Sequence, residues 1–148
     1  KRHKLAPYGY NSFELLRQRI TEVDMLNIAD LIKRLPLQKE LEVDGKKYLF
    51  AHAMTSDPEV REEDRYYLMG TMDIDSFFFA GIDGYISMCG HTPTDSIVWK
   101  KDRRYLDEPG TSIWANDRRN VYLLDCGCGF GSGKLACICL ETKERFYS

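Results

Sequence analysis

Residues 86–94 read Ile86-Ser87-Met88-Cys89-Gly90-His91-Thr92-Pro93-Thr94. The first four predict a short buried strand, which ends at the glycine because the following proline has no amide for a further ladder hydrogen bond. His91 is therefore expected just beyond the carboxyl end of a strand. In layered α/β folds, ligands collect at that end of the sheet. The preceding glycine also lets backbone come close to whatever the imidazole holds.

A second histidine follows a strand in the same way. The run 46–51 is rich in β-forming residues and ends at His52, before residues 55–58, which read as a turn. The chain has three histidines, so two of the three end predicted strands. Imidazole is a common transition-metal ligand, and a pair at converging strand ends indicates half of a metal site. Two ordinary histidines at a sheet edge fit the same pattern about equally well.

Composition predicts one soluble-type domain. The chain has 148 residues, of which 43% are hydrophobic, enough for a single core. A net charge of −2 with interspersed signs argues against nucleic acid or a membrane surface as a partner. There is no apolar run of about eighteen residues and no signal-peptide core, so neither membrane insertion nor export is expected. Five cysteines at low density suit a reducing compartment, which predicts a cytoplasmic protein.

Local patterns predict an α+β fold of two or three helices and a mostly antiparallel sheet. Thr21 with Asp24 resembles a capping box, and Asp44-Gly45 is a strong hairpin signal. The expected elements begin with helices over 13–20 and 21–35 and hairpin strands over 40–43 and 46–51. A helix-compatible charged stretch over 58–69 and a helix over 73–80, whose phenylalanines belong to the core, follow. The chain then continues with the strand leading to His91, a strand over 97–99, and a terminal β-meander over 120–125, 134–140 and 145–147.

The glycine-rich segment 126–134 is predicted to be a hairpin connection. A phosphate-binding P-loop needs a glycine five positions before its Gly-Lys and Ser or Thr after it, and Cys128 and Leu135 stand there instead. The cysteines leave a structural zinc site as an alternative, because two pairs at spacing two each project to one side of a hairpin. These pairs are Cys126 with Cys128 and Cys137 with Cys139. Zinc knuckles more often use wider spacing, and cysteine in an apolar strand acts as a small hydrophobe.

Three blocks in this order resemble the last three blocks of calcineurin-like metallophosphoesterases. The blocks are Tyr-Leu-Phe-Ala-His-Ala at 48–53, Gly-His-Thr-Pro-Thr at 90–94, and Asn-Val-Tyr-Leu-Leu-Asp-Cys-Gly at 120–127 followed by Gly-Lys-Leu at 133–135. The match is best to the serine/threonine protein phosphatase branch and to symmetrical diadenosine tetraphosphatases, and it covers nearly the whole chain. Any one block is weak, but the three together are fairly specific.

The resemblance implies a two-metal phosphoester hydrolase with an α/β/β/α sandwich fold, using manganese, iron or zinc. It implies that His52 and His91 ligate the second metal. Gly90, Thr92 and Asp125 would support these ligands from behind, and Arg61 or Arg65 would clamp the phosphate. Substrates of this family are phosphorylated proteins or (di)nucleoside polyphosphates.

The earlier blocks of that family, Asp-x-His, Gly-Asp-x-x-Asp-Arg-Gly and Gly-Asn-His-Glu, do not occur, and the chain has no Gly-Asp pair. The resemblance therefore implies that residues 1–148 are one partial domain, the carboxyl-terminal half, with no catalytic residue of its own. We expect negligible activity of this chain alone, weak or no metal binding, and a homodimer formed through an exposed sheet. The alternatives are a non-catalytic β-rich interaction module and the structural zinc protein.

Overall fold

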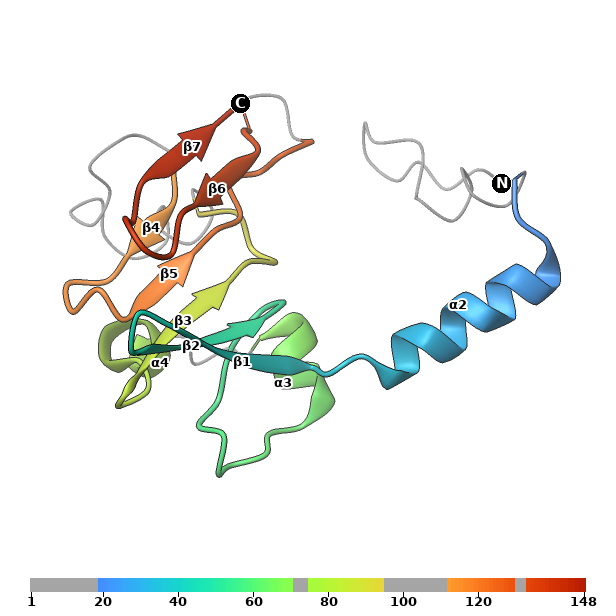
Figure 1. The fold of residues 1–148 in the computed structure, drawn as a ribbon, viewed down its shortest axis with the longest axis horizontal. Coiled ribbons are helices and arrows are strands. Elements are labelled where there is room, and N and C mark those ends of the chain that lie inside the picture. Colours follow the sequence, from blue (N-terminus) through green and yellow to red (C-terminus); the bar gives the residue numbers. More distant parts are fainter. Residues whose placement is uncertain (1–18, 71–74, 95–111, 130–132) are drawn as a thin grey trace. The chain divides into compact units, whose positions relative to one another are not determined.

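The computed structural model describes residues 19–70, 75–94, 112–129 and 133–148 (Figure 1). Its internal contacts divide the chain into two units, residues 1–36 and residues 37–148, which we describe separately. The strand predicted over 97–99 lies outside the described residues, and so does the helix predicted over 13–20, apart from its last two residues.

The first unit contains helix α2, Glu22–Arg34, which begins at the predicted capping box. The Thr21 amide donates to Asp24 Oδ2 at 2.8 Å, and the Asp24 amide donates to Thr21 Oγ1 at 3.2 Å. The Thr21 hydroxyl also donates to Asp24 Oδ2 at 2.7 Å, and this bond, followed by the one from the Thr21 amide, favours the charged carboxylate and lowers the pKa of Asp24. The helix ends at Leu35, whose backbone is extended as expected before Pro36. Both predicted ends of this helix are confirmed.

The second unit is built on a five-stranded sheet. Its two-residue turn at Asp44 (φ 50°) and Gly45 (φ 69°) has the left-handed geometry that matches strand twist, so the predicted hairpin is confirmed. The central strands β2, β3 and β5 run parallel, and the outer strands β1 and β4 run antiparallel to their neighbours. The strands, in the order in which they lie across the sheet, are β1 (Gln38–Val43), β2 (Lys46–Ala51), β3 (Tyr85–Cys89), β5 (Val121–Leu123) and β4 (Trp114–Ala115).

Short helices cover one face of this sheet. Helices α3 (Asp64–Met69) and α4 (Asp75–Ala80) lie between β2 and β3 in the chain (Figure 1). Phe77 and Phe78 of α4 are buried in a cluster with side chains from β3, β4 and β5. Phe79 is 51% exposed, so two of the three phenylalanines predicted for the core belong to it. None of the described helices has the length and apolar character to cross a membrane.

A two-stranded sheet covers the opposite face. Strands β6 (Ala136–Ile138) and β7 (Arg145–Tyr147) pair with each other, and β6 packs on the cluster around Tyr48. The Lys143 ammonium donates a hydrogen bond to the Tyr48 hydroxyl and lies 4.2 Å from the centroid of its ring. That hydroxyl donates to the Leu140 carbonyl at 3.1 Å. These two hydrogen bonds and the ring contact attach the loop between β6 and β7 to Tyr48, a fully buried residue of the large sheet.

The predicted α+β class is confirmed, with antiparallel pairing in three of the five strand pairs. The three strands predicted for the terminal meander form and the last two pair antiparallel, but the predicted pairing of the first with the second is wrong. All three residues of β5 are buried, so that strand lies inside the large sheet beside β3, whereas β6 and β7 form their own sheet. Segment 126–134 therefore does not connect two paired strands as predicted; of its described residues, Gly127 and Lys134 form an isolated parallel bridge. The helix predicted within 58–69 is also shorter, since α3 begins only at Asp64.

Candidate metal centre

Three neighbouring parallel strands deliver the predicted site residues to one edge of the sheet. β2 ends directly before His52, β3 ends directly before Gly90 and His91, and Asp125 follows the end of β5 by two residues. Because β2, β3 and β5 are adjacent and parallel, their carboxyl ends meet. The sequence placed each residue after a strand, and the sheet order brings these ends together.

The two histidines are in direct contact. His52 Nε2 lies 2.9 Å from His91 Nδ1, and the ring centroids are 4.9 Å apart at an interplanar angle of 69°. Which nitrogen carries the proton depends on the tautomer. His52 is exposed and His91 is half-buried, so solvent reaches the pair. The residues that the sequence predicted as metal ligands are therefore brought together at the surface, 39 positions apart in the chain.

The backbone at His91 is strained. Its φ of 70° lies in the left-handed region, which few residues other than glycine adopt. The Thr92 amide donates to the Gly90 carbonyl at 2.8 Å, so His91 is the middle residue of a γ-turn with positive φ, a rare and strained form. Strain of this kind is typical of functional sites. The hydrogen bond also gives Thr92 a structural role, since its backbone amide closes the turn.

Buried hydroxyl groups anchor the segment that follows His52. Thr55 Oγ1 donates to Ser87 Oγ of β3 at 2.7 Å, and both side chains are fully buried. The Tyr66 hydroxyl donates to the Thr55 carbonyl at 3.1 Å. The sequence of residues 55–58 predicted a turn, and their anchoring role was not predicted. The one signal was Ser87, a polar residue within an otherwise apolar strand.

Asp125 supports the histidine loops without touching the ring nitrogens. Its carbonyl accepts a hydrogen bond from the Thr94 amide at 2.9 Å, and its Oδ1 accepts one from the Gly127 amide at 2.8 Å. The Gly90 amide in turn donates to the His52 carbonyl at 2.9 Å. A Cβ added at Gly90 would meet that carbonyl at 3.5 Å, an ordinary contact, so this glycine is not required for space.

The histidine pair fits a transition metal ion. Two imidazole nitrogens bound to one ion at about 2.1 Å lie roughly 3 Å apart at octahedral angles and roughly 3.4 Å apart at tetrahedral angles. The separation of 2.9 Å in the structure is that of a hydrogen bond between the two rings, so a bound ion would replace this bond. Within the described residues, no group of three or more His, Cys, Asp or Glu side chains could hold a metal ion. An ion on this pair therefore needs further ligands from elsewhere.

The four paired cysteines do not form the alternative zinc site within the described residues. Cys126 is buried, Cys128 and Cys137 are exposed, and Cys139 donates through Sγ to Glu141 Oε2 at 3.1 Å. Burial, followed by the nearby Asp125 carboxylate, raises the pKa of the Cys126 thiol.

The two candidate phosphate-binding arginines lie at the start of α3. Arg61 precedes the helix and pairs with Asp64 at 3.5 Å, with 83% of its own side chain exposed. Arg65 lies in the first turn and is exposed. In the part of the chain that the structure describes, neither makes a hydrogen bond or ion pair with the histidines. Their role stays a prediction.

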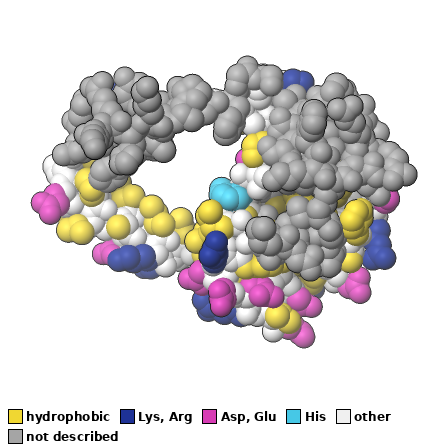
Figure 2. All heavy atoms as spheres, turned by 180° about the vertical axis from the view of Figure 1, so that it is seen from behind, with side chains coloured by type: hydrophobic (Ala, Val, Ile, Leu, Met, Phe, Trp, Pro, Cys, Tyr) yellow, Lys and Arg dark blue, Asp and Glu magenta, His cyan; other side chains and the backbone are white. Residues whose placement is uncertain are grey.

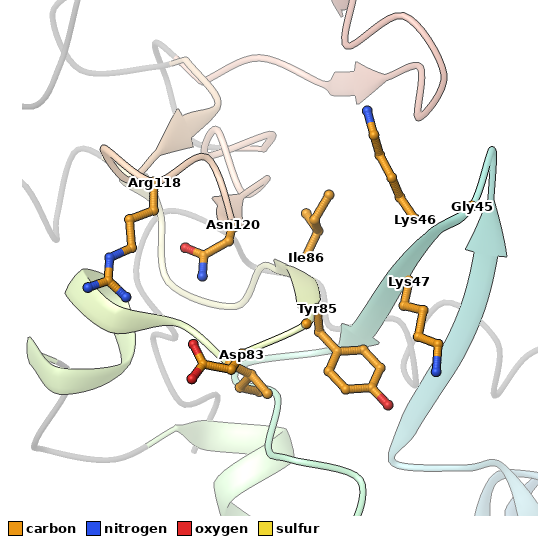
Figure 3. A pocket seen from close by; sticks show the side chains of 10 residues that line it. Gly45, Lys46, Lys47, Asp83, Tyr85, Ile86, Arg118 and Asn120 are labelled. Atoms are coloured by element: carbon orange, nitrogen blue, oxygen red, sulfur yellow. The ribbon is translucent and has the colours of Figure 1, made fainter.

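A hollow of about 540 Å³ lies at the opposite edge of the sheet, where β2, β3 and β5 begin (Figure 3). Lys46, Lys47 and Arg118 line it together with Asp83 and Tyr85. In Figure 3 the three cationic side chains point in different directions, and the Lys47 ammonium lies 5.6 Å from the Tyr85 ring centroid. These cations do not converge on one point, as an anion site would need.

Comparison with known proteins adds no relative: the chain matches no family model, no curated protein and no solved structure.

Proposed function

We propose that this chain contributes two histidine ligands of the second metal in a two-metal phosphoester hydrolase of the calcineurin-like type. The observation that carries the proposal is the contact of His52 and His91 at the joined carboxyl ends of two parallel strands, 2.9 Å apart. The strained backbone at His91 also supports the proposal, since such strain is typical of functional sites.

In this proposal each side chain has a definite task. His52 Nε2 and His91 Nδ1 face each other and hold the ion, while Asp125 and the γ-turn fix the loop that carries His91. Manganese, iron or zinc would activate a hydroxide and neutralise phosphate oxygens. The remaining metal ligands would come from outside the described residues. Arg61 or Arg65 is the proposed phosphate contact.

The proposed substrates are phosphorylated proteins or (di)nucleoside polyphosphates, and the proposed compartment is the cytoplasm, which suits five free thiols. With the two imidazoles as the ligands found together among the described residues, we expect weak metal binding and negligible turnover by this chain alone.

Metal binding and hydrolysis of an aryl phosphate under added manganese test the proposal. Metal titration should give measurable binding to the chain, at least tenfold weaker binding to a His52→Ala variant, and unchanged binding to a His3→Ala variant, which removes the third histidine. His52 is exposed, so its replacement leaves the fold intact. Equal metal affinity of all three proteins would refute the proposal. Rapid turnover by the chain alone would refute the need for outside ligands.

A non-catalytic interaction module is a second candidate, and the outer face of the β6–β7 sheet favours it. Leu135, directly before β6, is 62% exposed, and Phe146 of β7 is 49% exposed, whereas Ala136 and Ile138 of β6 pack on the core. Apolar side chains gathered on one face mark interaction surfaces. In this case the stability of the chain would not respond to metal ions, and association through this sheet would survive chelation.

A further inference from the structure

Helix α2 carries an apolar face that lies open to solvent. None of its 13 residues is buried among the described part of the chain. Residues at spacings of three, four and seven share one face of a helix. On α2 this face, which we call the α2 stripe, consists of Met25, Ile28, Ala29, Ile32 and the C-cap residue Leu35. Ile32 is 60% exposed, and Figure 2 shows hydrophobic side chains in a row along the helix.

The charges of α2 are divided between its two ends. Glu22 and Asp24 lie in the first turn, and Lys33 and Arg34 lie in the last. At about 100° per residue, Glu22 and Lys33 fall on one side of the α2 stripe, and Asp24 and Arg34 fall on the other. Lys33 pairs with Asp30 of its own helix at 3.7 Å, but both side chains are exposed, so this pair is weak. Each side of the stripe therefore has an acidic end and a basic end.

We propose that two copies of this chain pair through their α2 stripes, with the two helices antiparallel. In this orientation the same side of each helix meets, so Glu22 of each copy lies near the partner's Lys33. A register that sets Met25 opposite the partner's Ile32 brings these charges to within about two residues, or about 3 Å, along the axis. Parallel helices would instead place acid beside acid and base beside base. A second copy is thus the occupant that the charge pattern favours.

The size of α2 determines how strong this pairing is. A helix of 13 residues is about 20 Å long, so two of them bury less than the roughly 1,200 Å² at which stable interfaces begin. Pairing should therefore be weak and depend on protein concentration. Isolated helices of this length are marginal in water, so the helical content of the chain should rise as the copies pair. This inference does not depend on the proposed metal site.

The test is the mass of the full chain in solution, measured by sedimentation over a series of protein concentrations at low salt with a chelator present. The mass should rise from monomer towards dimer. An Ile28→Ala, Ile32→Ala double variant keeps good helix formers at both positions and should pair roughly tenfold more weakly or worse. The matched control is Val23→Ala, on the opposite side of the helix, where the side chain is 65% exposed. It should pair as the unchanged chain does.

Charge reversal tests the orientation of the helices. Glu22→Lys or Lys33→Glu alone places like charges at both ends of an antiparallel pair and should weaken pairing several-fold. A mixture of these two variants has opposite charges at both ends again and should regain pairing. Added salt should reduce the difference between the single variants and the mixture. Rescue on mixing requires contact between chains, because a change within one chain cannot produce it.

Three outcomes would overturn the inference. The first is a monomer at every concentration. The second is a lower unfolding free energy of the Ile28→Ala, Ile32→Ala variant with no change in mass, which would show that the α2 stripe packs within its own chain. The third is pairing that persists in this variant, which would place the interface elsewhere, as in the predicted homodimer through an exposed sheet. Metal titration of the His52→Ala variant tests the proposed function separately, so either proposal can fail alone.

Discussion

The backbone amide of Gly90 donates a 2.9 Å hydrogen bond to the carbonyl oxygen of His52. This bond joins the two loops that carry the histidines, independently of either imidazole. The positions of the loops are thus set by main-chain pairing that continues beyond β2 and β3, and the side chains can be replaced without losing it. His52 and His91 can therefore be probed separately from the fold.

The left-handed backbone at His91 predicts an unusual order of stability among its variants. At a position with φ of 70°, glycine is unstrained, whereas alanine retains strain of about 1–2 kcal/mol. His91→Gly should therefore unfold at higher urea concentration than His91→Ala, although glycine has the larger unfolded-state entropy. The reverse order, which is usual at positions with negative φ, would show that the γ-turn does not form.

Two glycines should respond differently to alanine. Gly81 has φ of 67°, and an added Cβ would lie 2.5 Å from Asn120 Nδ2, which is held by a hydrogen bond to the Ala80 carbonyl. Gly81→Ala should cost about 1–3 kcal/mol of unfolding free energy. Gly90→Ala meets only ordinary contacts and should cost less than about 1 kcal/mol. Urea unfolding of both variants checks the contrast, and similar losses would contradict it.

The contact of Lys143 with Tyr48 should contribute measurably to stability. Lys143→Met keeps the apolar stem and removes the ammonium, which loses a hydrogen bond and a cation–π contact worth about 0.5–2 kcal/mol. The matched control is Lys134→Met, whose ammonium lies 5.5 Å from the ring centroid of the exposed Tyr147 and should contribute little. Hydrogen exchange of β6 and β7 should accelerate in the first variant only. Equal effects of the two substitutions would show that the contact of Lys143 with the buried Tyr48 ring stabilises the fold no more than the contact of Lys134 with Tyr147.

Alkaline pH should weaken the fold through Tyr66. Burial, followed by the Glu62 carboxylate, raises the pKa of Tyr66 to about 12, from 10.0. Between these values the unfolded chain releases the phenol proton and the folded chain retains it. The contribution of Tyr66 to the unfolding free energy is therefore complete below pH 10 and is lost as pH rises towards 12. The unfolding free energy of Tyr66→Phe should fall less steeply across this window, and equal slopes would contradict the shift.

The local patterns of the sequence determined α2, the hairpin and the strand before His91. The capping box at Thr21, the Asp44-Gly45 turn and the break at Gly90 act over a few residues, so neighbours in the chain suffice to specify them. The placement of both histidines after strands followed from the same local signals. The extent of α3 and the partner of β5 did not, because both depend on which side chains the rest of the unit buries.

Only the tertiary structure decided that the two histidines meet. Strand order is a long-range property: β2, β3 and β5 become neighbours because residues far apart in the chain bury apolar side chains on both faces of one sheet. The same packing places Thr55 against Ser87 and bends the backbone at His91 into its strained turn. The sequence by itself therefore named His52 and His91 as candidates, and the parallel arrangement of their strands brings the ring nitrogens to 2.9 Å.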